Sequence, residues 1–138
     1  MSNKKKISTD NIPKAIIYTS KLLQFLSTDL TVKFAKKLFT TPIKHKIPKR
    51  EFEMDNNSKQ ELFYIPSIDK KIMVYHYGNS PKKVLLVHGW SGRGTQLVKI
   101  ADELLKMGYM TISFDAPAHG KSKGNYSIMT EFIASSLE

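Results

Sequence analysis

The segment VLLVHGWSGRGTQLVKIADELLKMGYMTISFD, residues 84–115, decides how the main part of this chain folds. Its first four residues are apolar on both faces, which is typical of a strand buried between two layers of helices. Apolar side chains then recur every three or four positions over residues 97–105, and Gly108 follows as a helix stop signal. Residues 110–115 have the composition of a second strand. Because a helix joins the two strands, they are predicted to lie parallel in one sheet, with a right-handed crossover.

Segments rich in strand-forming residues precede this unit, at residues 51–54, 61–65 and 71–77. The last two flank the turn-like sequence PSIDK and are predicted to pair as an antiparallel hairpin. After residue 115 a loop leads to the start of a further helix, for which Ser127 is the predicted N-cap. The predicted fold class is therefore α/β, with an antiparallel hairpin followed by a parallel strand–helix–strand unit.

Two amphipathic helices are predicted before these strands, over about residues 12–26 and 30–39. Residues 1–50 contain 12 Lys or Arg and only two acidic residues, whereas the rest of the chain contains ten of each. The net charge of +10 therefore belongs to the N-terminal segment. We divide the chain into a basic helical extension, residues 1–49, and an α/β domain, residues 50–138.

The basic extension allows two interpretations. In one, its helices pack against the rest of the protein and keep their lysines in water. In the other, residues 1–50 make a weak electrostatic contact with an anionic membrane surface. Nucleic acid is not a predicted partner, because the basic residues are not interleaved with aromatic ones and no groove-reading motif accompanies them.

Composition excludes further classes of site. The sequence has no cysteine, so disulfides, thiolate zinc sites and cysteine nucleophiles are absent. Its four histidines include no His-x-x-x-His pair, and we predict neither a metal nor another cofactor. Lys14 and Lys21 interrupt the N-terminal apolar run before it reaches signal-peptide length, and no stretch approaches the ~18 apolar residues of a spanning helix. The predicted location is cytoplasmic.

Ser122 lies in GKSKG, residues 120–124, which fits both the Gly-x-Ser-x-Gly pattern of a serine nucleophile and the end of a phosphate-binding loop. The phosphate loop would need glycine at the position of Asp115. A nucleophile elbow would follow its strand directly, yet residues 116–119 intervene, and no histidine follows His119 to act as the base. Ser122 is therefore predicted to be neither a nucleophile nor a phosphate ligand.

Two loops carry a family resemblance. VLLVHGWSGRGTQL, residues 84–97, and SFDAPAHGKS, residues 113–122, resemble loops of the α/β-hydrolase family, which has a His-Gly-x oxyanion loop after its third strand and an Asp-x-Pro-Gly-His-Gly-x-Ser loop after its fourth. Ala118 stands where that family usually has glycine, the residue that most readily adopts a positive φ. The resemblance covers about residues 60–138. It implies the N-terminal part of an α/β-hydrolase sheet, ending before the nucleophile elbow.

The resemblance also implies roles for individual residues. The backbone N–H of Trp90 is expected to be one donor of the oxyanion hole, while the nucleophile, the acid and the base histidine lie outside this chain. Five neighbouring residues are expected to support the loops: His88, Gly89, Ser91, Asp115 and His119. Among them, Asp115 is expected to cap backbone donors of its tight turn. Arg93 lies beside the first loop, where exposure to solvent is the default expectation.

The functional expectation follows from this resemblance. The parent protein is expected to be a serine hydrolase that acts on a small-molecule ester or related acyl substrate, and this chain alone is expected to be inactive. The alternative is a non-catalytic, basic module that binds a membrane surface or a partner on a hydrolase-like scaffold. The family's sheet order places residues 84–88 beside a later strand, so this chain is expected to expose them as an apolar edge and to associate.

Overall fold

The computed structural model describes residues 12–137 and divides into two compact units, Met1–Phe39 and Thr40–Glu138. Residues 40–49, which the sequence analysis placed in the N-terminal extension, belong to the second unit. Each unit is described by itself below.

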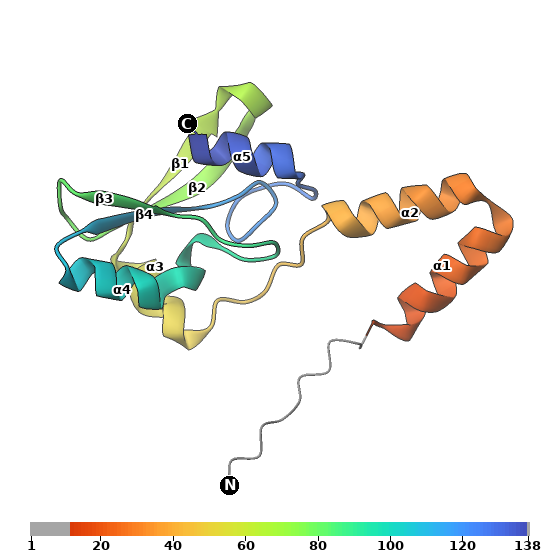
Figure 1. The fold of residues 1–138 in the computed structure, drawn as a ribbon, viewed down its shortest axis with the longest axis horizontal. Coiled ribbons are helices and arrows are strands. Elements are labelled where there is room, and N and C mark those ends of the chain that lie inside the picture. The colour runs from red at the N-terminus through yellow and green to blue at the C-terminus, as the bar shows by residue number, and fades with distance from the viewer. Residues whose placement is uncertain (1–11, 138) are drawn as a thin grey trace, which may run out of the picture. The chain divides into compact units, whose positions relative to one another are not determined.

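The first unit contains the two predicted helices, α1 (Lys14–Leu26) and α2 (Thr28–Thr40), the second of which ends at the unit boundary (Figure 1). Ser27 between them has extended backbone, and its N–H donates to the Leu23 carbonyl at 2.8 Å, so it closes the last turn of α1. The Thr31 hydroxyl donates to the Ser27 carbonyl at 3.0 Å. No residue of either helix is buried. Within residues 12–137, every helix falls short of the length and apolar character that a membrane span requires.

The second unit is built on a four-stranded sheet in the order β1-β2-β4-β3. Its strands are β1 (Lys59–Ile65), β2 (Lys70–Tyr77), β3 (Lys83–Leu86) and β4 (Met110–Asp115). The predicted antiparallel hairpin is confirmed as β1 and β2, with Phe63 opposite Ile72. The predicted parallel pair is confirmed as β3 and β4. β2 joins the two pairs by an antiparallel ladder with β4 that ends at Met73 opposite Asp115.

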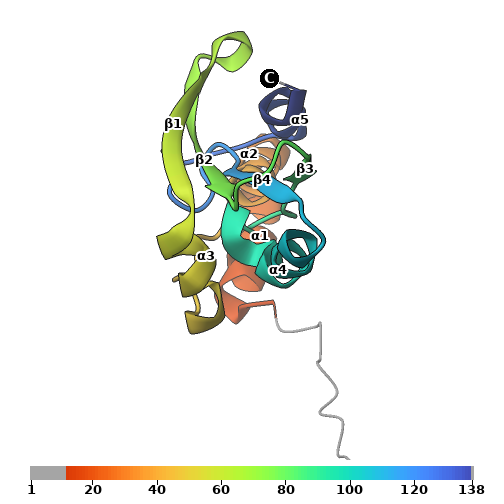
Figure 2. The ribbon, with the colours of Figure 1, turned by 90° about the vertical axis from the view of Figure 1, so that its left-hand side faces the viewer.

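Helices cover both faces of this sheet (Figure 1, Figure 2). α3 (Phe52–Asn57) and α4 (Val98–Lys106) lie on one face, and α5 (Met129–Leu137) lies on the other. Each face has its own apolar cluster. The buried members of the first are Met54, Tyr77, Leu86, Val98 and Ala101, and those of the second are Ile65, Ile72, Phe114 and Ala116, against which Phe132 and Ala134 of α5 pack. The sheet is therefore the middle of three layers.

The prediction of a strand at residues 51–54 is wrong. These residues belong to a 3₁₀ turn, Lys49–Glu51, and to the first turn of α3. An alternation of only four residues fits one turn of helix as well as a short strand, so the period cannot distinguish them. Pro48 precedes the turn, Glu53 and Asp55 suit the positive end of a helix, and Met54 is fully buried in the core.

The N-cap prediction for Ser127 is also wrong. α5 begins two residues later, at Met129, and the Ser127 hydroxyl makes no hydrogen bond within the described residues. The Ser127 N–H instead donates to the Thr40 carbonyl at 2.8 Å. This bond fixes the loop before α5 to Thr40, the first residue of the second unit.

β3 is covered on one face only, contrary to the expectation of a strand buried on both. Leu86 is 8% exposed, whereas Leu85, on the opposite face, is 46% exposed. β3 is the last strand of the sheet within residues 12–137, since β4 is its only partner there. The described sheet thus has the apolar edge that was expected.

Candidate functional site

Two loops meet where β3 and β4 end. Because these strands are parallel, their carboxyl ends lie at the same edge of the sheet, and residues 87–93 and 116–128 leave from that edge. In the first loop the Gly92 N–H donates to the Gly89 carbonyl at 2.9 Å, which closes a four-residue turn. Trp90 and Ser91 are its two central residues, and Ser91 has a φ of 56°.

The backbone N–H of Trp90 has no partner in this turn. Within residues 12–137 its N–H donates to no other group. The residue is 47% exposed, and its indole makes an edge contact with the His119 ring, with ring centres 5.1 Å apart. A hydrogen-bond donor is thus available at the carboxyl end of β3, on a turn that the bond between Gly92 and Gly89 closes.

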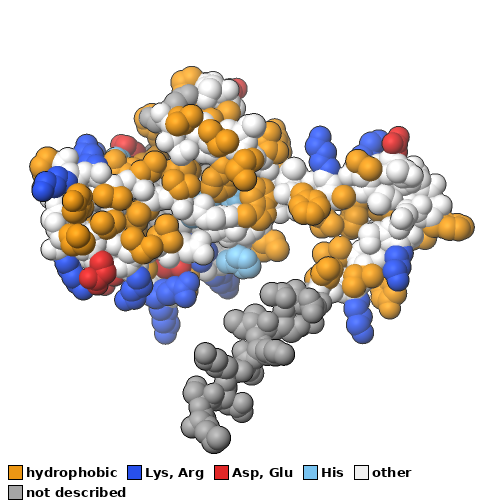
Figure 3. Space-filling model, in the orientation of Figure 1, with side chains coloured by type: hydrophobic (Ala, Val, Ile, Leu, Met, Phe, Trp, Pro, Cys, Tyr) orange, Lys and Arg blue, Asp and Glu red, His pale blue; other side chains and the backbone are white. Residues whose placement is uncertain are grey.

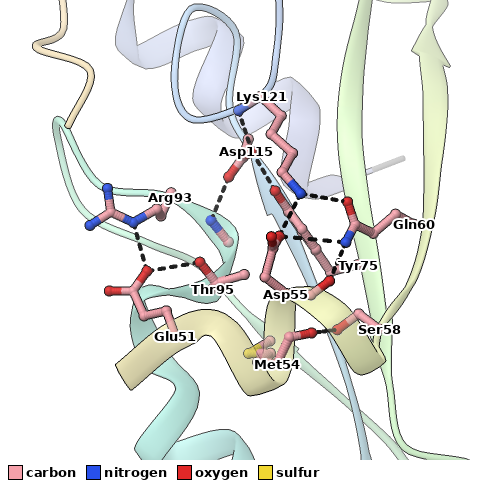
Figure 4. Close-up of polar contacts among 11 residues, drawn as sticks. Glu51, Met54, Asp55, Ser58, Gln60, Tyr75, Arg93, Thr95, Asp115 and Lys121 are labelled. Atoms are coloured by element: carbon pink, nitrogen blue, oxygen red, sulfur yellow. Dashed lines mark hydrogen bonds and ion pairs between the residues drawn. The ribbon is translucent and has the colours of Figure 1, made fainter. Parts of the chain in front are cut away.

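Asp115, the last residue of β4, joins the two loops (Figure 4). It is fully buried, and its carboxylate accepts three hydrogen bonds: from the Gly94 N–H at 2.6 Å, the Lys121 N–H at 2.7 Å and the Tyr75 hydroxyl at 2.8 Å. Burial, with the adjacent Asp115 charge, raises the pKa of Tyr75, so its phenol stays a donor. The predicted capping of the turn by Asp115 is what the geometry shows, and the same carboxylate also holds the loop after β3.

Two glycines make this arrangement possible. A Cβ atom on Gly94 would lie 2.7 Å from Cδ2 of Tyr75, and one on Gly120 would overlap the Asp115 carboxylate. Gly120 also has a φ of 43°, in the left-handed region. Side chains at either position would push the loops away from Asp115.

Ser122, in the second loop, is fully buried. Its hydroxyl donates to the Asp115 carbonyl at 2.5 Å and accepts the Met73 N–H of β2 at 2.8 Å. Both hydrogen bonds of the hydroxyl are made to backbone groups, and its proton is held by the Asp115 carbonyl rather than by a base. The geometry gives Ser122 a structural role in the loop.

His88 and His119 make backbone hydrogen bonds within the loops. His88 Nε2 accepts the Ala116 N–H at 3.1 Å, so its Nδ1 carries the proton and donates to the Gly89 carbonyl at 2.7 Å. His119 Nδ1 donates to the Pro117 carbonyl at 2.9 Å. Burial lowers the pKa of both imidazoles, which are therefore neutral at pH 7.

These imidazoles also belong to a ring cluster of His88, Trp90, His119 and Phe132. His119 lies at its centre, with ring-centre distances of 5.1 Å to each of the other three. Phe132 comes from α5, so the cluster connects the loop after β3, the loop after β4 and the helix that follows. Aromatic pairs in such tilted and edge arrangements stabilise a site beyond the area that they bury.

Glu51 is a buried charged residue that sequence reasoning missed. Its Oε2 accepts from Arg93 Nε at 2.6 Å and from the Thr95 hydroxyl at 2.8 Å (Figure 4). Arg93 donates a further hydrogen bond to the His45 carbonyl at 3.2 Å. Its guanidinium therefore has protein partners, whereas the sequence analysis expected it to be exposed to solvent. A glutamate in an alternating segment resembles a solvent-facing strand residue, and no local signal marks it as buried.

The segment of residues 41–47, which we call the strap, touches both loops. The Ile43 N–H donates to the Ser91 hydroxyl at 3.0 Å, and Lys44 Nζ donates to the Ser122 carbonyl at 2.7 Å. Pro42 is buried. The strap therefore crosses the carboxyl edge of the sheet and ties the first loop to the second.

A separate set of contacts holds the second loop to α3. Lys121 Nζ lies 2.5 Å from Asp55 Oδ1 and donates to Gln60 Oε1 at 2.9 Å, while the Gln60 amide donates to the Asp55 carbonyl (Figure 4). Among residues 12–137, no group of three or more His, Cys, Asp or Glu side chains is placed to hold a metal ion.

Comparison with known proteins identifies the fold. No protein-family model and no curated protein matches the chain. An esterase of Pyrococcus furiosus matches in one crystal form with a TM-score of 0.59 at 22% identity, over 70% of this chain and 38% of that one. A second crystal form of the same esterase matches with a TM-score of 0.54 at 24% identity, over 70% of this chain and 37% of the esterase chain. A thioesterase domain from the curacin biosynthetic pathway matches with a TM-score of 0.48 at 21% identity, over 57% of this chain and 29% of the thioesterase chain.

The predicted fold is confirmed by these matches: the chain has part of the α/β-hydrolase fold. It spans about 38% of the length of the first esterase structure that it matches. At this level of identity the likeness concerns the fold, and what the site does must be argued from its residues.

Proposed function

We propose that this chain forms the oxyanion-binding part of a serine hydrolase that acts on an ester or a related acyl substrate. The observation that carries the proposal is the unpartnered Trp90 N–H, at the carboxyl end of β3 in a sheet of α/β-hydrolase type. In acyl transfer, negative charge develops on the substrate oxygen, and a fixed backbone N–H stabilises that charge most when it is already oriented.

The surroundings of Trp90 supply this orientation. The turn from Gly89 to Gly92 is closed by its own hydrogen bond, and the Ser91 hydroxyl is held from outside by the strap. Ser91 has a left-handed φ although it is not a glycine, a conformation that persists only where the surroundings hold it. The donor therefore needs little reorganisation when an oxyanion forms.

The remaining catalytic groups are proposed to come from outside residues 1–138. A nucleophilic serine needs a base within hydrogen-bond reach, whereas the Ser122 hydroxyl contacts only backbone groups. His88 has both ring nitrogens engaged with backbone groups, which leaves it no lone pair to accept a proton from a nucleophile. The chain is thus proposed to contribute transition-state binding but not the covalent step.

The test removes the Trp90 N–H without removing the turn. Trp90 occupies the second position of a β-turn, where proline is favoured, so Trp90→Pro deletes the donor and keeps a compatible backbone. Trp90→Ala is the matched control, because it lacks the indole equally but keeps the N–H. In the native protein that carries this sequence, kcat for a short-chain nitrophenyl ester is expected to fall about 10²–10³-fold further in the proline variant than in the alanine variant.

Two outcomes would overturn the proposal. One is a native protein that hydrolyses no acyl ester and reacts with no serine-directed fluorophosphonate. The other is equal activity of the Trp90→Pro and Trp90→Ala variants. The 138-residue chain assayed alone is expected to be inactive, and turnover that is lost on Ser122→Ala would contradict the structural role of that serine.

A further inference from the structure

The helix pair α1–α2 exposes an unusual amount of apolar surface. Neither helix contains a buried residue, and Figure 3 shows orange apolar side chains on this part of the chain. The large apolar side chains exposed by more than half here are Ile12, Tyr18, Leu22, Phe25, Leu26, Val32 and Phe39, with Phe25 at 88%. Isolated exposed apolar residues are ordinary, but a run of them on two consecutive helices marks an interaction surface.

In α1 these side chains form one stripe. Tyr18, Leu22 and Phe25 follow each other at spacings of four and three residues, so they lie on the same face of the helix. Lys14 and Lys21 lie at one border of this stripe by the same geometry. Long lysine side chains in that position can reach polar surroundings while the apolar stripe is covered.

α2 divides more sharply into two faces. Lys33, Lys36 and Lys37 share one sector of the helix, in which Lys37 borders Leu30. The rest of the surface carries the apolar side chains of Leu30, Val32, Phe34, Leu38 and Phe39. A helix with an apolar face, a lysine-rich polar face and low net hydrophobicity has the composition of helices that lie in a membrane interface.

Charge indicates what covers this surface. Residues 12–39 carry five lysines and one aspartate, a net charge of +4, and residues 40–138 carry 14 basic and ten acidic residues, also +4. A second copy of the chain therefore offers the helix pair no net opposite charge, and neither does its own second unit. A bilayer with anionic headgroups offers both an apolar phase and negative charge.

We infer that α1 and α2 bind the surface of an anionic phospholipid membrane, with their apolar stripes in the interface and their lysines at the headgroups. Each helix has 13 residues and a length of about 20 Å at 1.5 Å per residue, so it lies on the membrane rather than crossing it. This inference does not depend on the proposed hydrolase activity.

The experiment measures co-sedimentation of the 138-residue chain with vesicles. One set contains phosphatidylcholine with about one-third phosphatidylserine, and the other contains phosphatidylcholine alone. The partition coefficient is expected to be at least about tenfold higher on the anionic vesicles, and to fall by at least about fivefold when NaCl is raised from about 0.05 M to about 0.5 M.

Two matched pairs of variants locate the binding surface. The double variant Lys33→Gln with Lys37→Gln is expected to weaken binding by about tenfold or more, whereas Lys59→Gln with Lys99→Gln, at exposed lysines of the second unit, is expected to change it by less than about twofold. Glutamine and lysine have similar helix propensities, so the helices are retained. Phe25→Ser should likewise weaken binding, and Leu62→Ser on β1, which is 56% exposed, should not.

Three results would overturn the inference: no binding to either vesicle, equal binding to both, or binding that salt does not change. A fourth is self-association in size-exclusion chromatography that Phe25→Ser abolishes, without vesicle binding. That result would assign the apolar stripe to a second copy of the chain.

Discussion

The helix pair α1–α2 and the loops after β3 and β4 place polar and apolar groups in opposite ways. The helices expose large apolar side chains such as Phe25 and bury nothing. The loops bury Asp115, Ser122 and His119 to 1% exposure or less. Buried polar groups are costly to leave without partners, whereas exposed side chains contribute little to folding. Substitutions should therefore affect folding in the loops, and binding in the helices.

The largest expected effect is at Asp115. Replacement by alanine leaves the Gly94 and Lys121 N–H groups and the Tyr75 hydroxyl without their buried acceptor. We expect the free energy of unfolding to fall by about 3–5 kcal/mol, measured by urea denaturation. Asp102→Ala, which removes a longer contact of 3.3 Å with Tyr77, serves as the control and should cost less than about 1 kcal/mol. Equal losses in the two variants would show that Asp115 does not organise the loops.

A matched pair of serines compares the two regions directly. Ser122→Ala leaves the part-buried Met73 N–H without an acceptor and is expected to cost about 1–3 kcal/mol of unfolding free energy. Ser20→Ala in α1 removes an exposed bond from its hydroxyl to the Ile17 carbonyl and should change it by no more than about 0.5 kcal/mol. Thermal or urea unfolding measures the change in unfolding free energy for both variants. A larger loss for Ser20→Ala than for Ser122→Ala would contradict the proposed difference between the two regions.

Acid should weaken the loops before it affects the helices. The pKa values of His88 and His119 are lowered by burial, so the unfolded chain binds protons that the folded chain excludes. The contribution of these two neutral histidines to the free energy of unfolding is therefore complete above about pH 6.5, the ordinary histidine pKa. It decreases as the pH drops below that value. Urea midpoints between about pH 7 and pH 5.5 measure this slope. His119→Phe keeps a ring in the cluster and should flatten the slope.

Ala118 tests the strain in the second loop. Its φ is 64°, in the left-handed region, which costs a non-glycine residue about 1–2 kcal/mol. In Ala118→Gly the relief of this strain offsets two losses, that of a buried methyl group and that of the restricted backbone freedom of alanine in the unfolded chain. The free energy of unfolding should therefore stay within about 0.5 kcal/mol of the original value. Ala101→Gly in α4 loses a buried methyl without any such relief and should cost about 1–2 kcal/mol by the same unfolding assay. Similar losses at both positions would mean that Ala118 is not strained.

The smallest expected effect is at Phe25. Its side chain is 88% exposed, so Phe25→Ser should leave the unfolding of the second unit unchanged within about 0.5 kcal/mol. The chain has one tryptophan, Trp90, and its fluorescence reports on that unit alone. A clear loss of stability by this signal would show that α1 supports the sheet, and the contrast between the two regions would fail.

Much of the fold was predictable because long periodic segments and connecting loops gave consistent signals. The helix at residues 97–105 requires β3 and β4 to be parallel, and four turn residues, 66–69, join β1 to β2. The short α3 was missed because four alternating residues do not distinguish a strand from a helical turn. Burial of β3 on both faces was overestimated, since apolar composition does not show whether a covering layer is present.

The site was predictable only where its residues lie next to one another in sequence. His88, Trp90, Asp115 and His119 lie at or just after the ends of two strands, so the sequence alone locates the loops. The contacts of Glu51 with Arg93, and of the strap with both loops, join residues more than 40 positions apart. Each of these residues is ordinary in its local sequence, and only the tertiary fold brings them together.

The hydrogen bond from the Met73 amide to the Ser122 hydroxyl has a spectroscopic consequence. Every residue before Met73 on β2 pairs with β1 alone, and Ser122 takes the place of a strand residue where the ladder with β4 ends. The amide proton of Met73 is then shielded from solvent by a loop side chain rather than by a neighbouring strand. Its exchange with deuterium requires that the second loop open, whereas exchange along the ladder requires that the sheet separate. One backbone proton in the middle of β2 thus records how often the candidate site opens while the sheet remains folded.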